Sequence, residues 1–215
     1  MMIVIVVSSA RRSRKWEPQK KRMRLTREKA AENRAKVVDA ALGLFQRRGF
    51  ADVGVAELMG AAGLTHGGFY NHFESKADLE AQACGLAFQR ALGAIGKVAA
   101  KPAGAERRAA MRLYIERYLS TRARDAAGAS CPMVSFGTDV SRESREVQAR
   151  YAQGLRAYVE LMGAALESEA STARATVGEL VGALSLARSV AREDRALSDS
   201  ILEAAKARIL ARLDR

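Results

Sequence analysis

Residues 55–76 read VAELMGAAGLTHGGFYNHFESK, and this stretch holds both histidines of the 215-residue chain. Its first part, Val55–Ala62, fits a two-turn helix that Gly63 can end, because glycine tolerates the left-handed backbone. After a tight connection, Thr65 is suited to cap a third helix, for which we expect the bounds His66–Phe73. A helix, a short glycine turn and a second short helix form the helix-turn-helix pattern.

Two adjacent glycines, Gly67 and Gly68, fall in the first turn of the expected third helix. Each costs about 1 kcal/mol relative to alanine in a helix, so a short helix needs a reason to keep them. Missing side chains let the helix N-terminus approach another backbone, and its free N–H groups favour phosphate. The alternative is a tight packing inside the protein. Phe69 and Phe73, four residues apart, are expected to anchor this helix to its neighbours.

Helical patterns continue on both sides of this stretch. Before it, an apolar stripe with helical spacing stops at Gly49, which predicts the first helix. After it, Ser75 and Asp78 are spaced as in a capping box and predict the start of a long fourth helix, which Lys101–Gly104 interrupts. The stripe residues are Val38, Ala41, Leu42 and Phe45 before the turn, and Ala81, Cys84, Phe88, Leu92 and Ile95 after it.

The second half of the chain also has the helical period. Further helices are expected around residues 111–118 and 147–162, and residues 128–144 between them are expected to be irregular or at most a short helix. The last two helices, expected over 173–191 and 197–213, form a hairpin with wide apolar faces. Such faces fit either a dimer interface or an ordinary core, and both readings stay open.

Composition supports an all-α fold. The chain is 48% apolar, which is enough for a substantial core, and it has only three prolines. Alanine, arginine, leucine and glutamate dominate and favour helix over sheet.

Positive charge is concentrated at the N-terminus. Before residue 25 the chain has eight basic side chains and one acidic side chain, which is +7 of its net +12. Such a basic segment suits a polyanion, most often nucleic acid and less often acidic lipid, while a merely solubilising charge is the other interpretation.

The opening sequence, MMIVIVVSSA, is too short to span a membrane and lacks the preceding basic residue of a secretory signal. Met23 begins a sequence suited to a helix, so residues 1–22 are interpreted as an upstream extension of the reading frame. Two cysteines, Cys84 and Cys131, do not make a disulfide framework in a chain of this length. We therefore expect the protein in a reducing cytoplasm, and no membrane partner.

The order and spacing of several of these features resemble the DNA-binding domain of the TetR family of transcriptional repressors. The resemblance lies in Phe45, Gly49, the AAGLT turn at 61–65 and FYNHFESKADL at 69–79, and it covers about residues 27–79. It implies an all-helical dimer in which three N-terminal helices bind DNA, further helices bind a small molecule, and the last two pair the subunits. The expected parts are a basic, disordered extension (1–25), a helix-turn-helix domain (26–74), and a ligand-binding and dimerisation domain (75–215).

The resemblance also implies roles for single residues in the recognition helix. Some positions face bases in the family and others hold phosphates. One departure concerns the start of the second helix, where many members have Thr or Ser on a phosphate and this chain has Val53 and Gly54; backbone N–H groups can replace that contact. The expected DNA-binding residues are Thr65 at the cap, His66, Gly67, Gly68 and Asn71 facing bases, and Tyr70, His72 and Lys76 on phosphates.

A set of flexible and amphipathic side chains in the second half could line a ligand cavity, although such stripes more often form ordinary core. Cys131 stands among arginine-rich sequence, where a thiolate could be stabilised and oxidised, while a buried, inert thiol is the more common case. The candidate ligand-binding residues are Met111, Tyr114, Tyr118, Cys131, Met133, Phe136, Tyr151 and Tyr158.

The sequence contains no hydrolase or phosphate-loop pattern, and its histidines and cysteines match no zinc-ligand spacing. We therefore expect no enzyme activity, no cofactor and no metal. The predicted function is a homodimeric repressor that a small apolar or aromatic ligand releases from a palindromic operator. The alternatives are a nucleic-acid-binding protein without a ligand, and a helical scaffold or membrane-associated protein that uses residues 1–24.

Overall fold

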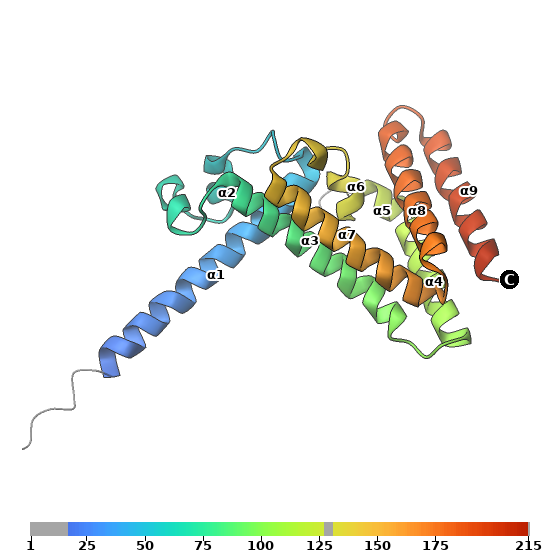
Figure 1. The fold of residues 1–215 in the computed structure, drawn as a ribbon. Coiled ribbons are helices and arrows are strands. Elements are labelled where there is room, and N and C mark those ends of the chain that lie inside the picture. The colour runs from blue at the N-terminus through green and yellow to red at the C-terminus, as the bar shows by residue number, and fades with distance from the viewer. Residues whose placement is uncertain (1–16, 127–130, 215) are drawn as a thin grey trace, which may run out of the picture.

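The structure is a computed structural model that describes residues 17–126 and 131–214, with side chains from residue 27 onward. Within these residues every regular element is helical, which confirms the predicted all-α class (Figure 1). The elements are α1 Glu17–Arg48, α2 Val55–Ala61, η1 His66–Asn71, α3 Lys76–Ala99, α4 Ala105–Tyr118, α5 Thr121–Asp125, α6 Pro132–Phe136, η3 Val140–Arg142, α7 Arg145–Leu166, α8 Ala170–Val190 and α9 Arg195–Leu213.

The N-terminal head consists of α1, α2 and η1, and its turns lie where the glycines predict them. Gly49 and Gly63 both have positive φ, 79° and 71°, so each ends a helix in the left-handed region. The Phe69 and Phe73 rings lie 5.4 Å apart and are buried, which confirms their role as the anchor of η1.

Helix α1 begins earlier than the sequence suggests. Residues 17–25 continue it, so the expectation of a disordered segment up to residue 25 is wrong for this part, while residues 1–16 lie outside the described residues. Lys, Arg, Gln and Glu have high helix propensities, and Pro18 stands in the first turn, where proline is tolerated. The N-terminal half of α1 extends away from the remainder of the molecule (Figure 1).

The start of α3 has the predicted cap. The Ser75 hydroxyl accepts a hydrogen bond from the Asp78 N–H at 3.0 Å, and the Asp78 carboxylate accepts one from the Glu74 N–H at 3.2 Å. The exchange satisfies two N–H groups at the junction of head and body.

Helices α3 and α7 pack side by side through the body (Figure 1). They approach closely at Gly154, where an added Cβ would lie 2.2 Å from Cγ of Phe88. The expected α8–α9 hairpin is present at the far end of the molecule from η1 (Figure 1).

The segment expected to be irregular contains the short helices α6 and η3. Helix α6 packs on the head, where the Phe136 and Phe50 rings lie 4.7 Å apart. The segment therefore joins the body to the end of α1.

Candidate nucleic-acid interface

The recognition segment η1 is a 3-10 helix that ends at Asn71, not the α-helix to Phe73 that the sequence suggested. Two glycines weaken an α-helix this short, and 3-10 geometry is common in such pieces. Thr65 does occupy the N-cap position, but its side chain accepts no capping hydrogen bond, so the capping role expected for it is wrong. The first N–H groups of η1 are left without a side-chain cap.

Both glycines of η1 have room for a side chain. A Cβ on Gly67 would meet nothing within 4 Å, and a Cβ on Gly68 would make only ordinary contacts, at 3.7 Å to Cε of Met59 and 3.9 Å to Oγ1 of Thr65. Tight packing inside the protein therefore does not explain these glycines.

The polar side chains of η1 point to solvent around these glycines. Tyr70 is 75% exposed, and His66 and Asn71 are exposed as well, whereas His72 is half-buried. A large aromatic side chain that is this exposed places apolar surface in water. This exposure is unfavourable unless a partner covers the ring. The segment thus presents hydrogen-bond donors and one aromatic ring around a centre that carries no side chains, because glycines form that centre.

Arg34, which the sequence did not single out, holds the recognition segment in place. From α1 its guanidinium donates to the His72 carbonyl and, at 3.1 Å, to the Gln82 side chain, and it stacks 4.9 Å from the centre of the Phe73 ring. Asp78 lies 3.6 Å from the same guanidinium. The only sequence signal was a basic residue on α1, because all its partners are distant in the chain.

Lys76 is engaged inside the protein. Its ammonium donates to the Phe50 carbonyl at 2.7 Å and lies 3.3 Å from the Glu80 carboxylate. Glu80 is buried, and burial raises the pKa of its carboxyl. Lys76 therefore links the start of α3 to the loop after α1, and the phosphate contact expected for it stays a prediction.

The start of α2 offers backbone N–H groups. Gly54 is its N-cap and gives no side-chain hydrogen bond, while the neighbouring Val53 is fully buried. Arg48 fixes this turn, since its guanidinium contacts both the Asp52 carbonyl and the Glu57 carboxylate at 2.5 Å.

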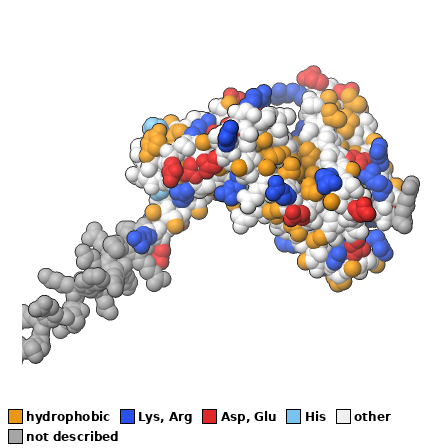
Figure 2. Space-filling view, in the orientation of Figure 1, with side chains coloured by type: hydrophobic (Ala, Val, Ile, Leu, Met, Phe, Trp, Pro, Cys, Tyr) orange, Lys and Arg blue, Asp and Glu red, His pale blue; other side chains and the backbone are white. Residues whose placement is uncertain are grey.

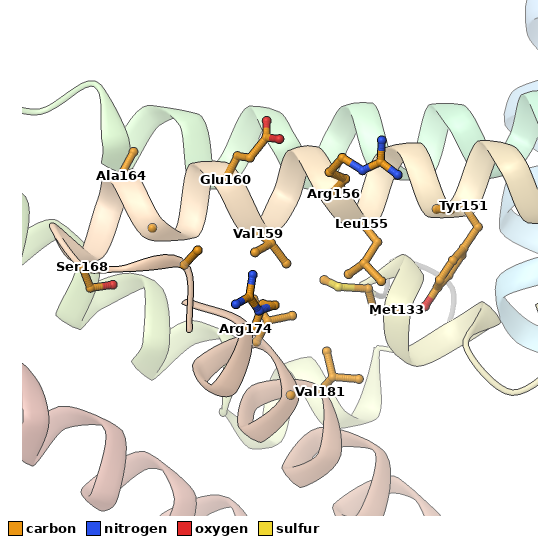
Figure 3. A pocket seen from close by; sticks show the side chains of 15 residues that line it. Met133, Tyr151, Leu155, Arg156, Val159, Glu160, Ala164, Ser168, Arg174 and Val181 are labelled. Atoms are coloured by element: carbon orange, nitrogen blue, oxygen red, sulfur yellow. The ribbon is translucent and has the colours of Figure 1, made fainter. Parts of the chain in front are cut away.

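The body contains a pocket of about 940 Å³ between α7 and α8, closed at one end by α6 (Figure 3). Of the eight candidate ligand-binding residues, Met133 and Tyr151 line this pocket. The other six lie outside its lining, which is mainly apolar but includes two arginines and a glutamate. The lining residues are Met133, Tyr151, Ala152, Leu155, Arg156, Val159, Glu160, Gly163, Ala164, Ser168, Ala170, Arg174, Val177, Gly178 and Val181.

The remaining candidates belong to the packed interior. Met111, Phe136 and Tyr158 are fully buried, and the Tyr114 and Tyr158 hydroxyls share a hydrogen bond at 2.5 Å. Burial raises the pKa of the half-buried Cys131 thiol, so the thiolate that oxidation needs is disfavoured. The structure thus supports the inert reading of Cys131.

A helix-turn-helix head on a helical body defines a class of bacterial DNA-binding regulators. A family model described as bacterial regulatory proteins of the tetR family matches residues 37–83. The chain is 41% identical over 56 residues to the transcriptional regulator AcrR of Shigella flexneri, a stretch that covers 26% of each protein. The matched stretch thus spans about a quarter of this curated relative.

Solved structures extend the likeness to the whole fold. The reduced form of NemR from E. coli is 20% identical with a TM-score of 0.70, over 83% of this chain and 96% of that one. A TetR-family regulator from Agrobacterium tumefaciens is 18% identical with a TM-score of 0.69, over 85% and 98%. The match of the family model to the head and the shared fold together support a TetR-family regulator. Among its described residues, no helix is both long and apolar enough to cross a membrane.

Proposed function

We propose that this TetR-family regulator represses transcription by binding a palindromic DNA operator as a homodimer, with residues 26–74 as the DNA-binding head and residues 75–215 as the body. The observation that carries the proposal is the open space over Gly67, next to a Gly68 that also has room for a side chain, with exposed donors around both. A surface without side chains in its centre suits close approach to a nucleic-acid backbone and base edges.

Within this proposal, His66 and Asn71 face base edges and Tyr70 and His72 hold phosphates. With two glycines in the reading segment, few side chains can contact bases, so shape and thymine-methyl contact carry part of the specificity. Lys76 adds its positive charge to this surface, while its ammonium remains hydrogen-bonded to the Phe50 carbonyl.

The dimer is proposed to form through α8 and α9. Leu186 on α8 and Leu197 at the start of α9 are 61% and 46% exposed, whereas the hairpin's other large apolar side chains are buried or half-buried. Two exposed leucines on one hairpin favour burial against a second copy.

Titration of the dimer against genomic DNA fragments tests the proposal. We expect sequence-selective binding to a palindrome whose half-sites lie about one helical turn apart or slightly more, because two-fold related recognition segments must meet two major grooves. Equal affinity for all fragments at physiological salt would contradict the repressor proposal. It would favour a ligand-independent protein that binds nucleic acid without sequence selectivity.

A small apolar or aromatic ligand is proposed to release the operator. The angle between the two heads depends on α3, which begins at the head and packs along α7. A ligand that binds one position of α7 more tightly than another shifts the equilibrium between two head angles. The size of this shift is set by the difference in the ligand's affinity for the two states. Coupling of about 1–3 kcal/mol would weaken operator binding roughly 5- to 150-fold.

A further inference from the structure

The pocket between α7 and α8 has an apolar half and a cationic end. Leu155 and Val159 on α7 and Val177 and Val181 on α8 face it together with Met133. Leu155, Val159, Val181 and Met133 lie in the middle of the pocket and toward α6, whereas Ser168 lies at the opposite end, where α7 turns into α8 (Figure 3).

Two arginines line the pocket, Arg156 on α7 and Arg174 on α8, and Arg174 is the one that reaches into it from α8 (Figure 3). It extends from α8 toward α7, whereas the Glu160 carboxylate points to the other side of α7 (Figure 3). Within the described residues Arg174 forms no ion pair or hydrogen bond. A guanidinium that borders apolar surface without a carboxylate is suited to receive one from a ligand.

Two further groups lie beyond Arg174, at the end where α7 turns into α8, and lack partners. The Ser168 hydroxyl is buried and has no hydrogen-bond partner among the described residues. Helix α8 begins at Ala170, and its N-cap residue, Glu169, gives no side-chain hydrogen bond. Its first N–H groups and the positive end of its dipole therefore remain available to an anion. Both Ser168 and Ala170 line the pocket.

We infer that the pocket binds an elongated amphipathic carboxylate, with the carboxylate at Ser168, Ala170 and Arg174 and the apolar tail along α7 toward Met133. The inference rests on the proposed function, and it adds a carboxylate to the apolar ligand proposed there. From Tyr151 to Ala164 the α7 wall is about 20 Å long at 1.5 Å per residue. This length suits a chain better than a compact ring.

Calorimetric titration of the full-length protein with decanoate and with decan-1-ol, in the absence of DNA, tests the headgroup. The two probes share the tail and differ in the charge. We expect decanoate to bind at least about tenfold more tightly, because its carboxylate accepts charge-assisted hydrogen bonds. Equal affinities would overturn the inference.

Variants at two arginines locate the carboxylate. Arg174→Gln should lower decanoate affinity about tenfold and leave decan-1-ol affinity unchanged. Arg145→Gln is the matched control, since Arg145 is an exposed arginine on the first turn of α7 and does not line the pocket. Unchanged decanoate affinity in Arg174→Gln, or an equal loss in both variants, would overturn the assignment.

Operator titration with bound decanoate separates this inference from the proposed switch. Decanoate that binds through Arg174 and leaves operator affinity unchanged would contradict the switch and support the ligand class. Operator release by a neutral aromatic compound, combined with equal binding of decanoate and decan-1-ol, would support the switch and overturn the ligand class.

Discussion

Glycines have opposite roles in the head and in the body of this protein. In η1, a Cβ on Gly67 would enter open space, whereas in α7 a Cβ on Gly154 would lie 2.2 Å from the Phe88 ring. Packing explains the glycine in the body. The glycine in the head has no such explanation in the fold, and we predict that a partner outside the chain requires it. A glycine becomes evidence for function when its surroundings leave room for a side chain.

Gly154→Ala tests the packing half of this comparison and should have the largest effect. The new methyl group collides with a ring carbon of Phe88 in the core, so α3 and α7 must separate. We expect the free energy of unfolding, measured in urea, to fall by about 3 kcal/mol, which is in the upper part of the range for overpacked cores.

Gly93→Ala is its control, because a Cβ on Gly93 in α3 meets nothing within 4 Å. It should stabilise the protein by about 1 kcal/mol, as expected for removing a helical glycine. An unchanged urea midpoint in Gly154→Ala would mean that the close approach of α3 and α7 is not needed.

Lys76→Ala tests a residue that lies between the two regions. It removes the cation from the buried Glu80, and the expected loss is about 1–2 kcal/mol, less than for a fully buried pair because Lys76 is 32% exposed. Burial already raises the pKa of Glu80 in the folded state, so the folded state binds more protons than the unfolded state. Stability therefore falls as pH rises through this raised pKa, and the variant should lose more at high pH.

Urea titrations at several pH values measure this dependence. Adding Glu80→Gln to Lys76→Ala should remove much of the pH-dependent loss, because no buried carboxyl is left to ionise. A loss of operator affinity with unchanged stability would instead assign Lys76 to the DNA alone.

Gly67→Leu tests the functional half of the comparison. The side chain has room in the free protein, so the thermal midpoint should not fall. On the operator it blocks close approach, and we expect at least about tenfold weaker binding, which corresponds to 1.4 kcal/mol. The control is Gly93→Leu, an equally open glycine in the body, which should leave the operator affinity unchanged. Full operator affinity in Gly67→Leu would remove the argument from open glycines.

Local patterns predicted most of the fold. Gly49, Gly63 and the Ser75 cap marked helix ends correctly because each acts within its own turn of chain. Contacts between distant residues were not predictable in this way: the bonds of Arg34 to the head and of Lys76 to the Phe50 carbonyl join separate elements. The position of the pocket was also missed, because an apolar helical stripe looks the same in a sequence whether it lines a cavity or fills a core.

Tyr70→Ala should have the smallest effect and separates positioning from reading. Tyr70 is 75% exposed, and its ring contacts Phe69 edge-on at 5.3 Å, so its loss should hardly change stability. If its hydroxyl holds a phosphate, binding should weaken by about 0.5–1.5 kcal/mol, the net value of one hydrogen bond. The loss should be equal on the operator and on unrelated DNA, because phosphate contacts carry no sequence information. Tyr70→Phe, which keeps the ring, is the matched variant, and anisotropy titrations of both DNAs measure the effect. A loss confined to the operator would place Tyr70 on a base edge and move the phosphate contact elsewhere in the head.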